Sequence, residues 1–525
     1  MRTTRHAFVG LIVLGLGSDL GVDAGMGGAA LGQSDGGSPA PARGLRVRAD
    51  GAFEGCTLFA PIQSGSTYLI DMGGAVVHEW KTPYGPGASV YLLEDGNLLR
   101  CTRVDDNPRF WGGGIGGRIL EIEPDGKVAW TFTFSDEEHC QHHDVKRLPN
   151  GNVLLIAWEY LSIEEALRRG RDADAVSPEG FWPDALFEVE PIRPAGGRIV
   201  WEWHSKDHLI QDRDPEKPDY GAIPGHPGRI DVNGDHRDTP ALSEEELAKA
   251  AEREAELRAL GYVGGNAPEE NDAARSKPER RGDWLHTNAV DYHPGLDLVL
   301  LSVPHFDEVW ILDHSTTSAE AATSAGGRHG RGGDLLWRWG HPRRHGAGSD
   351  ADRRLFRQHD AQWIRPGLPG AGHLLLFNNG LGRPEPAHST VDELVLPLDA
   401  QRRFVHAAGR PFGPAAPAWS YAAPVREEFY SFFISGCQRL QNGNTLICSG
   451  KQGRFFEVDA AGTIVWEYWN PYGGELPSSF GGAAPKTAPG AGPIRVIEPN
   501  STFRCTRIAS DHPGLVRLGL RGPAR

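Results

Sequence analysis

Residues 126–132 read GKVAWTF: a glycine, two apolar positions one residue later, a tryptophan, and an aromatic residue two places further on. Three close copies and two weaker ones stand at residues 197–203, 333–339, 462–468, 74–80 and 418–421. Neighbouring copies are as little as about 50 residues apart, the length of one blade in known propeller repeats. The chain therefore contains a unit that is repeated six times.

Each unit predicts two β-hairpins. Alternating strands that end in an acidic turn lead into the repeat, as in residues 119–126 (ILEIEPDG) and 455–462 (FFEVDAAG). Asn-containing turns at residues 94–97, 149–152 and 441–444 mark the second hairpin. Two hairpins form a four-stranded antiparallel sheet, and a series of such sheets buries its apolar faces by stacking around an axis. The pattern predicts an all-β, six-bladed β-propeller over residues 52–515.

Composition agrees with short strands and many turns. The 525 residues include 68 Gly and 39 Pro but only 3 Met. The formal net charge is −15, and no run of Lys or Arg is long enough to follow a phosphate backbone, so we expect no nucleic-acid partner. An anionic substrate would need positive charge gathered locally from His and Arg.

The N-terminus predicts export. Basic residues precede an apolar stretch at 7–17 that is too short to span a bilayer but suits a signal peptide, which we expect within residues 1–32. A flexible linker is expected at 33–51, and a C-terminal tail at 516–525. An insertion predicts one surface helix at about 241–261. The mature protein is expected in the periplasm or outside the cell, with no membrane span.

Six cysteines fit an oxidising compartment, and they form no C-x-x-C pair of the kind that binds metals. Cys437 and Cys448 flank Asn442 and Gly443 symmetrically, so a tight hairpin would place them opposite each other. They are the one predicted disulfide. Two small buried thiols remain the alternative, since bridge geometry is not encoded in spacing.

Three histidines occupy matching positions in the repeat. His143 lies eight residues before Gly151, His359 eight before Gly367, and His286 nine before Gly295. The matching residue in the next unit is Ser435, eight before Gly443. Equivalent positions of a propeller are related by rotation about its axis. The three imidazoles are therefore expected to converge there.

Converging histidines are compatible with three roles. They could tie strands together, with His143-Asp144 and His359-Asp360 as structural pairs. They could bind zinc, although ligands from separate blades of a wide channel would have to come within ~2.1 Å of one ion. They could instead act on an anion, a neutral His serving as nucleophile while its neighbours hold the oxygens. We predict no metal.

Five segments together resemble the bacterial arylsulfotransferases: residues 142–152, 283–290, 301–317, 358–363 and 377–383. The resemblance covers roughly residues 52–506. It implies a six-bladed propeller that moves a sulfuryl group from an aryl sulfate to a phenol, without a nucleotide sulfate donor and with no cofactor. Aryl sulfates and phenols would be its small-molecule partners; the oligomeric state is not implied.

The resemblance also assigns roles. His359 would be the nucleophile that is transiently sulfated, and His143 and His286 would bind sulfate oxygens and assist proton movement. One position departs from the family: characterised members carry an arginine where this chain has Pro304, followed by His305. A missing guanidinium removes a bidentate clamp on the oxygens.

Other residues could compensate or assist. His305, Arg383 or Arg109 could supply the missing charge, and His142 could substitute for His143, although neighbouring residues of a strand point to opposite faces. Aromatic side chains could hold the substrate rings or simply pack, and the candidates are Trp111, Phe306, Tyr430 and Phe432.

Two other classes of protein share parts of this pattern. A non-catalytic propeller could bind a sulfated or phenolic ligand through the same histidines, because fold does not fix function. Quinone-cofactor dehydrogenases and assembly scaffolds use similar tryptophan repeats, but they generally have eight near-regular blades and need no histidine register.

Overall fold

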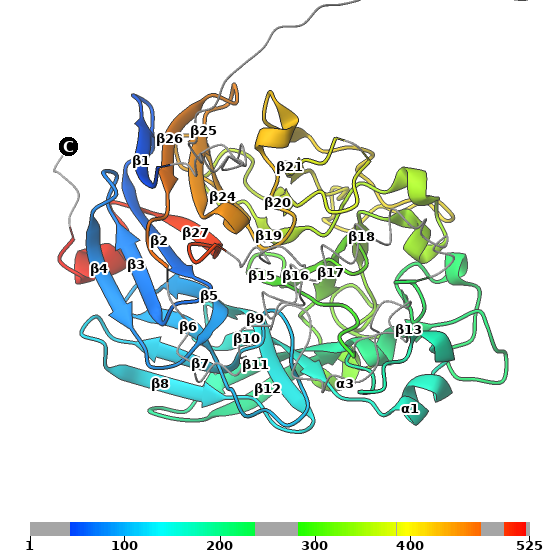
Figure 1. The fold of residues 1–525 in the computed structure, drawn as a ribbon. Helices are drawn as coiled ribbons and strands as arrows, with labels where there is room; N and C mark the ends of the chain where they lie inside the picture. The colour runs from blue at the N-terminus through cyan, green and yellow to red at the C-terminus, as the bar shows by residue number, and fades with distance from the viewer. Residues whose placement is uncertain (1–41, 237–281, 385, 474–497, 521–525) are drawn as a thin grey trace, which may run out of the picture. The chain divides into compact units, whose positions relative to one another are not determined.

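The computed structural model describes residues 42–236, 282–384, 386–473 and 498–520. The described residues from Arg43 onward form one compact unit. Six antiparallel sheets surround a common centre, which confirms the predicted all-β, six-bladed propeller (Figure 1). The expected signal peptide (1–32) and surface helix (241–261) lie outside the described residues.

Every blade has four strands, ordered from the axis outward. Blade 1 is β27 (Thr502–Ala509), β2 (Gly55–Pro61), β3 (Ser66–Ile70) and β4 (Val76–Lys81); blade 2 is β5 (Pro86–Leu92), β6 (Leu98–Arg103), β7 (Gly117–Ile122) and β8 (Val128–Thr133); blade 3 is β9 (His139–Arg147), β10 (Val153–Glu159), β11 (Asp184–Pro191) and β12 (Gly197–His204). Blade 4 is β15 (Ala289–His293), β16 (Leu298–Val303), β17 (Glu308–Asp313) and β18 (Trp337–Trp339); blade 5 is β19 (His359–Trp363), β20 (Leu374–Asn378), β21 (Thr390–Leu394) and β22 (Trp419–Tyr421); blade 6 is β23 (Gly436–Arg439), β24 (Thr445–Ser449), β25 (Arg454–Val458) and β26 (Ile464–Trp469).

A few elements lie outside the blades. Three short α-helices are described: α1 (Ile163–Arg168), α3 (Ser318–Ala321) and α4 (Pro513–Arg517). Strands β13 (Leu209–Ile210) and β14 (Ile230–Asp231) form a small parallel pair. Among the described residues, no helix has the length and apolar character needed to cross a membrane.

Both ends of the chain close the ring. The C-terminal strand β27 pairs with β2 and so becomes the innermost strand of blade 1. The strand β1 (Gly44–Arg48) pairs with β26 and adds a fifth strand to blade 6. Part of the stretch expected as linker (33–51) therefore belongs to the sheet, because the outer edge of β26 offers unpaired backbone groups that β1 satisfies.

The repeated tryptophan joins each blade to the next. In four copies it lies buried on the fourth strand of its blade, and its indole N–H donates to the following blade at 2.8–3.2 Å. The pairs are Trp130 with the Gly196 carbonyl, Trp201 with Thr316 Oγ1, Trp337 with the Gly413 carbonyl, and Trp466 with the Met72 carbonyl. The repeat thus encodes contacts between blades as well as strands.

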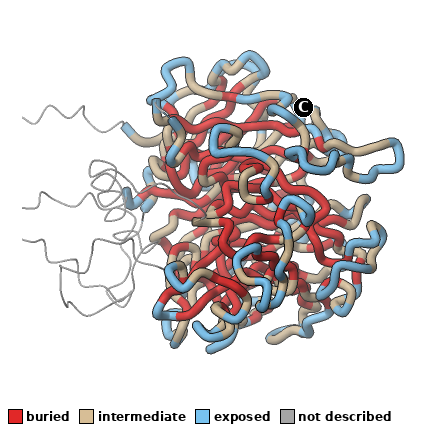
Figure 2. The backbone as a smooth tube through the Cα atoms, turned by 90° about the vertical axis from the view of Figure 1, so that its right-hand side faces the viewer, coloured by how far each residue is buried: buried red, intermediate tan, exposed pale blue. Residues whose placement is uncertain are grey.

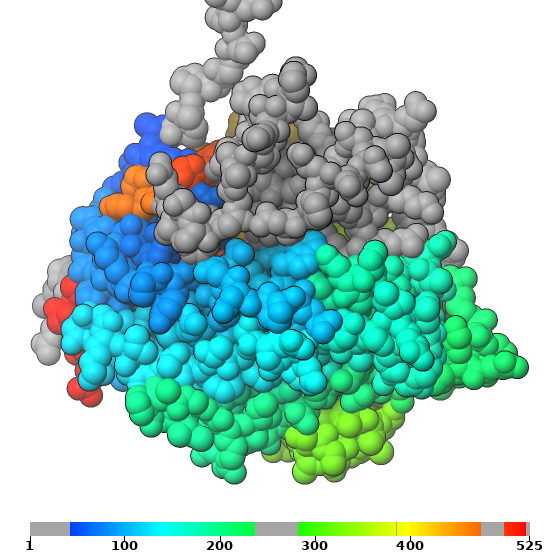
Figure 3. All heavy atoms as spheres, turned by 60° about the horizontal axis from the view of Figure 1, so that its bottom comes forward, coloured from blue at the N-terminus to red at the C-terminus, as the bar shows by residue number. Residues whose placement is uncertain are grey.

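The innermost strands form a closed ring in which β5, β9, β15, β19, β23 and β27 each contact the next. Buried backbone is concentrated inside the molecule, and exposed backbone lies in the turns (Figure 2). Across one face of the molecule, successive segments lie side by side in chain order from blue through cyan to green (Figure 3). Side chains at equivalent inner positions therefore approach one another.

The backbone of the inner strands is deformed at these positions. In each of blades 2 to 6, a non-glycine residue with positive φ stands at or beside the repeat position that the three histidines occupy. These residues are Ala88, His143, His286, Asp360 and Ser435. The strand pairing shifts register beside Ala88, His143 and Asp360. Such bulges re-aim side chains, and left-handed backbone in non-glycine residues is concentrated at functional sites.

Candidate active site

The three histidines of the register come together from three neighbouring blades. His143 lies on β9, His286 three residues before β15, and His359 begins β19. The ring centroids of His143 and His286 are 4.5 Å apart. Phe503 of β27 joins the group, with its ring 6.1 Å from His143 and 6.3 Å from His359. We call these three imidazoles the histidine cluster.

Hydrogen bonds fix the tautomer of His359. Asn379 donates from Nδ2 to the carbonyls of Ser431 and Ile434, both at 2.7 Å, so its Oδ1 is an acceptor. That oxygen lies 2.8 Å from Nδ1 of His359, and the Arg357 carbonyl lies 3.1 Å from the same nitrogen. Both partners only accept, so Nδ1 carries the proton. Nε2 keeps its lone pair.

Burial keeps two of the imidazoles neutral. Loss of solvent lowers the pKa of His359 to about 3, and the nearby rings and Arg504 reinforce this against its hydrogen bonds. Burial, followed by the charges of the neighbouring histidines, also lowers the pKa of His143 well below its usual range. The only form of His359 available near neutral pH is thus the nucleophilic one.

His286 belongs to a histidine–aspartate pair. Its Nδ1 donates to the Asp283 carboxylate, which also accepts a hydrogen bond of 3.0 Å from the Trp158 indole. Burial raises the pKa of Asp283, but His286 and its other partners outweigh this and hold it below its usual range. His305 stacks on the other side of His286, with ring centroids 4.9 Å apart. Nε2 is the ring nitrogen of His286 that Asp283 does not engage.

His142 supports His143. The two Nδ1 atoms lie 2.7 Å apart, and His142 stacks on Trp158 at 4.2 Å. His142 was expected on the opposite face of the strand, and that expectation is wrong because His143 has a φ of 54° and forms a bulge. Nε2 of His142 lies 3.4 Å from the Asp184 carboxylate.

A glycine makes room for the His143 ring. A Cβ placed on Gly114 would meet the Cε1 and Nε2 atoms of His143 at 2.2 Å, so the backbone of residue 114 lies flat against the imidazole. Gly114 also has a φ of 74°. It belongs to the glycine-rich stretch 112–117.

An arginine ties the residues that follow His143 and His359. Arg504 donates to Asp144 at 2.8 Å and lies 3.0 Å from the Asp360 carboxylate. It also donates to the Asn288 carbonyl at 2.8 Å. Burial raises the pKa of Asp360 to about 6, although Arg504 opposes the shift. Blades 3, 4 and 5 are thus held together directly beside the histidine cluster.

The charge expected from other residues is placed differently. His305 adjoins the cluster, but burial, assisted by Arg357, lowers its pKa to about 3. In this neutral form it supplies no positive charge. Arg383 donates to Thr390 Oγ1 at 3.2 Å. Arg109 donates to the Glu137 carbonyl at 2.7 Å. Neither has a contact with the three histidines.

The predicted aromatic residues divide into two groups. Tyr430 and Phe432 belong to the same apolar cluster as Phe503, the residue whose ring lies near His143 and His359. Phe306 is fully buried in another part of the core, against two tryptophans, and cannot hold a substrate ring. Trp111 packs at the edge of the cluster that contains Trp158.

The predicted disulfide between Cys437 and Cys448 is wrong. Cys437 pairs with Ile447, whereas Cys448 pairs with Gly436, so a one-residue offset turns the two thiols to opposite faces of the blade. Both are free and buried. The register of this hairpin is offset by one residue from the symmetric spacing, so Cys437 and Cys448 do not face each other across the two strands.

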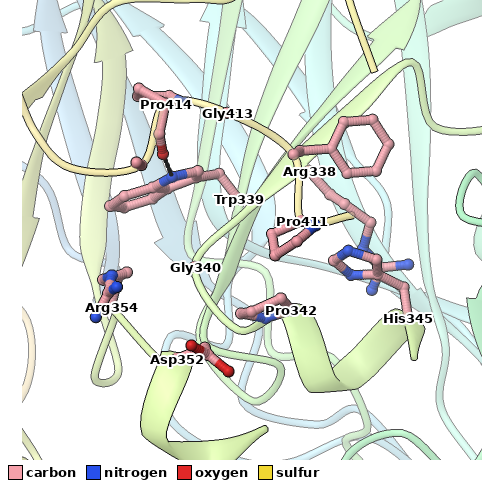
Figure 4. Close-up of a pocket in the computed structure, with 12 residues that line it drawn as sticks. Arg338, Trp339, Gly340, Pro342, His345, Asp352, Arg354, Pro411, Gly413 and Pro414 are labelled. Carbon is pink, nitrogen blue, oxygen red and sulfur yellow. Dashed lines mark hydrogen bonds between the residues drawn. The ribbon is translucent and has the colours of Figure 1, made fainter. Parts of the chain in front are cut away.

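Two cavities lie outside the cluster. One, of about 180 Å³, is lined by Asp144, Asp360 and Arg504 and continues from the cluster's supporting residues. The other, of about 250 Å³, lies against β18 between Trp339 and Pro411 (Figure 4). None of the three histidines lines either cavity.

Some residues of the site were missed by sequence reasoning. Asn379 stood inside a quoted segment (377–383), yet its role depends on a contact with another blade. Phe503 and Arg504 come from the C-terminal strand, which carries no copy of the repeat. Only a structure places them beside the cluster.

Comparison with known proteins adds a family. The sequence description of the family "Arylsulfotransferase (ASST)" matches residues 56–470, most of the chain. No curated protein matches significantly. Among solved structures, a protein of unknown function from Bacteroides caccae is 12% identical, with a TM-score of 0.38 over 79% of this chain and 94% of the other. Virginiamycin B lyase from Staphylococcus aureus is 9% identical, with a TM-score of 0.33 over 82% and 84%.

Proposed function

Because the chain belongs to the arylsulfotransferase family, we propose that it transfers a sulfuryl group from an aryl sulfate to a phenol through a sulfated His359. The observation that carries this proposal is the fixed tautomer of His359. Its Nδ1–H is bound by two acceptors, and its neutral Nε2 belongs to a cluster of three imidazoles. A nucleophile prepared in this way needs no separate base.

In the first half-reaction, Nε2 of His359 attacks the sulfur of the donor. The new bond joins nitrogen to sulfur, and the bond between sulfur and the aryl oxygen breaks. The electron pair of that bond leaves on the phenolate, a better leaving group than an alkoxide. A proton from Nε2 of His286 neutralises the phenolate, and Asp283 steadies the imidazolium through Nδ1 until then.

The second half-reaction reverses the first. The acceptor phenol gives its proton back to His286, and its oxygen attacks the sulfur on His359. The nitrogen–sulfur bond breaks, and its electron pair returns to Nε2. Donor and acceptor therefore use one site in turn, which predicts ping-pong kinetics.

His143 and the aromatic residues have supporting roles in this scheme. Nε2 of His143 is buried and has no hydrogen-bond partner among the described residues, so it is suited to a sulfate oxygen. Phe503, with Tyr430 and Phe432 in the same cluster, offers apolar surface for the aryl rings. The family supports aryl substrates in general.

The direct experiment is turnover of an aryl sulfate with and without a phenol acceptor. We expect parallel lines in double-reciprocal plots when donor and acceptor are varied, because the sulfated enzyme separates the two half-reactions. Binding of the aryl sulfate without any transfer would contradict the proposal and would identify a non-catalytic binding propeller. We also propose that the chain is exported, as residues 1–32 predict.

A further inference from the structure

Arg357 stands two residues before His359, and its backbone is fixed on both sides. Its N–H donates to the Asp307 carboxylate at 2.9 Å, and its carbonyl accepts from Nδ1 of His359 at 3.1 Å. Its φ of 60° lies in the left-handed region, which costs energy for an arginine. The surrounding contacts hold this backbone in place beside the nucleophile.

The guanidinium of Arg357 contacts Pro304, the residue that stands where members of the family carry an arginine. Its Nη1 lies 3.3 Å from the Pro304 carbonyl. Pro304 is followed by His305, whose ring stacks on His286 at 4.9 Å. Burial lowers the pKa of His305, and the charge of Arg357 is the next cause. The positive charge therefore acts on the edge of the histidine cluster.

Among the described residues, the guanidinium of Arg357 has no close ion pair: burial lowers its pKa, and Asp307 opposes this only from a longer distance. Within the described part of the chain, no carboxylate oxygen lies within 4.0 Å of the Arg357 guanidinium. The carboxylate of Asp307 forms its close ion pair with Arg353, at 3.0 Å. Arg504, in contrast, is paired with both Asp144 and Asp360. A partly buried cation without a close counter-charge is costly, so it is suited to an anion from outside the protein.

Arg100 shows that an arginine can lack a carboxylate for purely structural reasons. It is 1% exposed and donates three hydrogen bonds of 2.6–2.9 Å to Ser64, Gly65 and Thr67. Arg357 is intermediate in burial, and its guanidinium has one hydrogen bond, a long one of 3.3 Å, within the described residues. Arg357 thus keeps donors that Arg100 has already used.

From these contacts we propose that Arg357 binds the sulfate oxygens of the donor and takes the place of the arginine that Pro304 displaces. This inference rests on the proposed function. The planar guanidinium can present two parallel N–H groups to two oxygens of a sulfuryl group. It contacts blade 4 at Pro304 and belongs to the segment that leads into His359, so it can align the sulfur with Nε2.

Substitution of Arg357 tests the proposal. We expect Arg357→Ala to lower kcat/KM for an aryl sulfate about 10²- to 10³-fold. Arg357→Lys keeps the charge but not the fork, so it should recover only part of the loss. Arg354→Gln is the matched control: Arg354 is exposed, lies three residues earlier, and lines the separate cavity in Figure 4. It should keep full activity.

Two rescue experiments separate substrate binding from a structural role. Millimolar methylguanidinium should restore part of the activity of Arg357→Ala and none of the activity of His359→Asn. Adding Pro304→Arg to Arg357→Ala should also restore activity, because it returns the guanidinium to the family position. Activity of Arg357→Ala equal to that of Arg354→Gln would overturn the proposal.

Binding of inorganic sulfate gives a readout that does not depend on turnover. Sulfate should raise the Tm of the wild-type protein and of Arg354→Gln, and raise that of Arg357→Ala much less. Equal shifts in all three proteins would overturn the role of Arg357. Absence of turnover in the wild type, together with a sulfate shift that requires Arg357, would contradict the proposed function alone and leave the anion site supported.

Discussion

The two halves of the propeller ring share a backbone feature, positive φ at the inner strands, but differ in the side chains that they place there. In blades 3, 4 and 5, the deformed inner strands place His143, His286 and His359 together. In blades 2 and 6 the same positive φ occurs at Ala88 and Ser435, which bear no imidazole. The deformation is therefore a property of the repeat, and the reactive groups are a property of particular blades.

The second half of the ring supports the first. Ser435 donates to Ser431 and accepts from the Gly450 N–H, so its hydroxyl is used within blade 6. Phe503 of blade 1 lies against two of the histidines, and Arg504 binds the carboxylates beside them. In the proposed mechanism, one half of the ring therefore carries the reacting histidines, and the other half packs against them.

Exchange of the reactive side chain should have the largest effect. His359→Asn removes the nucleophile and should lower kcat by about 10⁴-fold or more, the scale seen when a nucleophile is deleted. Ser435→Ala changes the residue of blade 6 that matches the histidines and should lower kcat less than about threefold. The change removes only the hydrogen bonds of the Ser435 hydroxyl, and such a bond is worth ~1 kcal/mol of stability. Steady-state kinetics with an aryl sulfate measure kcat for both variants. Similar losses in both variants would contradict the division of the ring.

Loss of the Asn379 contact that fixes the tautomer of His359 should have the next largest effect. Asn379→Ala removes the closer of the two acceptors on Nδ1 of His359 and leaves only the Arg357 carbonyl, so it should lower kcat about 10²- to 10⁴-fold with little change in KM, as expected when a catalytic histidine loses its orienting partner. The control is a circular-dichroism melt, because the Nδ2 bonds of Asn379 also hold blade 6. Unchanged kcat in a folded variant would mean that Asn379 does not set the tautomer.

A steric change beneath His143 should have a smaller effect. Gly114→Ala places a Cβ 2.2 Å from the His143 ring and should lower kcat/KM up to about 10²-fold by displacing it. Gly126→Ala is the matched control, because Gly126 also has a positive φ of 90° but has nothing within 4 Å of the added Cβ. Both variants carry backbone strain, so equal kcat/KM values would show that the His143 position is unimportant.

The smallest expected effect is a change in the free energy of unfolding with pH. The pKa of His359 is lowered to about 3 by burial, so below its ordinary pKa of 6.5 the unfolded chain binds a proton that the folded protein does not. Stability from this residue is present above pH 6.5 and is lost as the pH falls toward 3. Between pH 7 and pH 5, wild type should lose about 2 kcal/mol relative to His359→Gln. Urea titrations at the two pH values measure the difference, and parallel losses would rule out a depressed pKa.

The spacing of residues was enough to predict the fold and the histidine register. Six copies of the repeat, five with a tryptophan at the central position and one with His78 there, predicted six blades. A distance of eight or nine residues to the next turn picked out His143, His286 and His359. These features are local and periodic, so a sequence carries them directly. The tryptophans also join neighbouring blades, which explains why the repeat remains visible across so many insertions.

Features that depend on backbone distortion or on contacts between blades could not be predicted in this way. The bulge at His143 brought His142 to the same site instead of the opposite face. A one-residue offset separated Cys437 from Cys448. Asn379 is oriented by the carbonyls of Ser431 and Ile434, 52 and 55 residues further along the chain, and the guanidinium of Arg357 contacts Pro304. No spacing rule links these residues.

Trapping of the sulfated enzyme is the most direct test of the central claim. The protein is incubated with an aryl sulfate and no acceptor, quenched under alkaline conditions that preserve phosphoramidate-like bonds, digested, and mapped by mass spectrometry. We predict a burst of one phenol per protein molecule and one sulfuryl group on the peptide that contains His359. Turnover with a phenol acceptor but with the sulfuryl group on another residue, or with no burst at all, would contradict the claim.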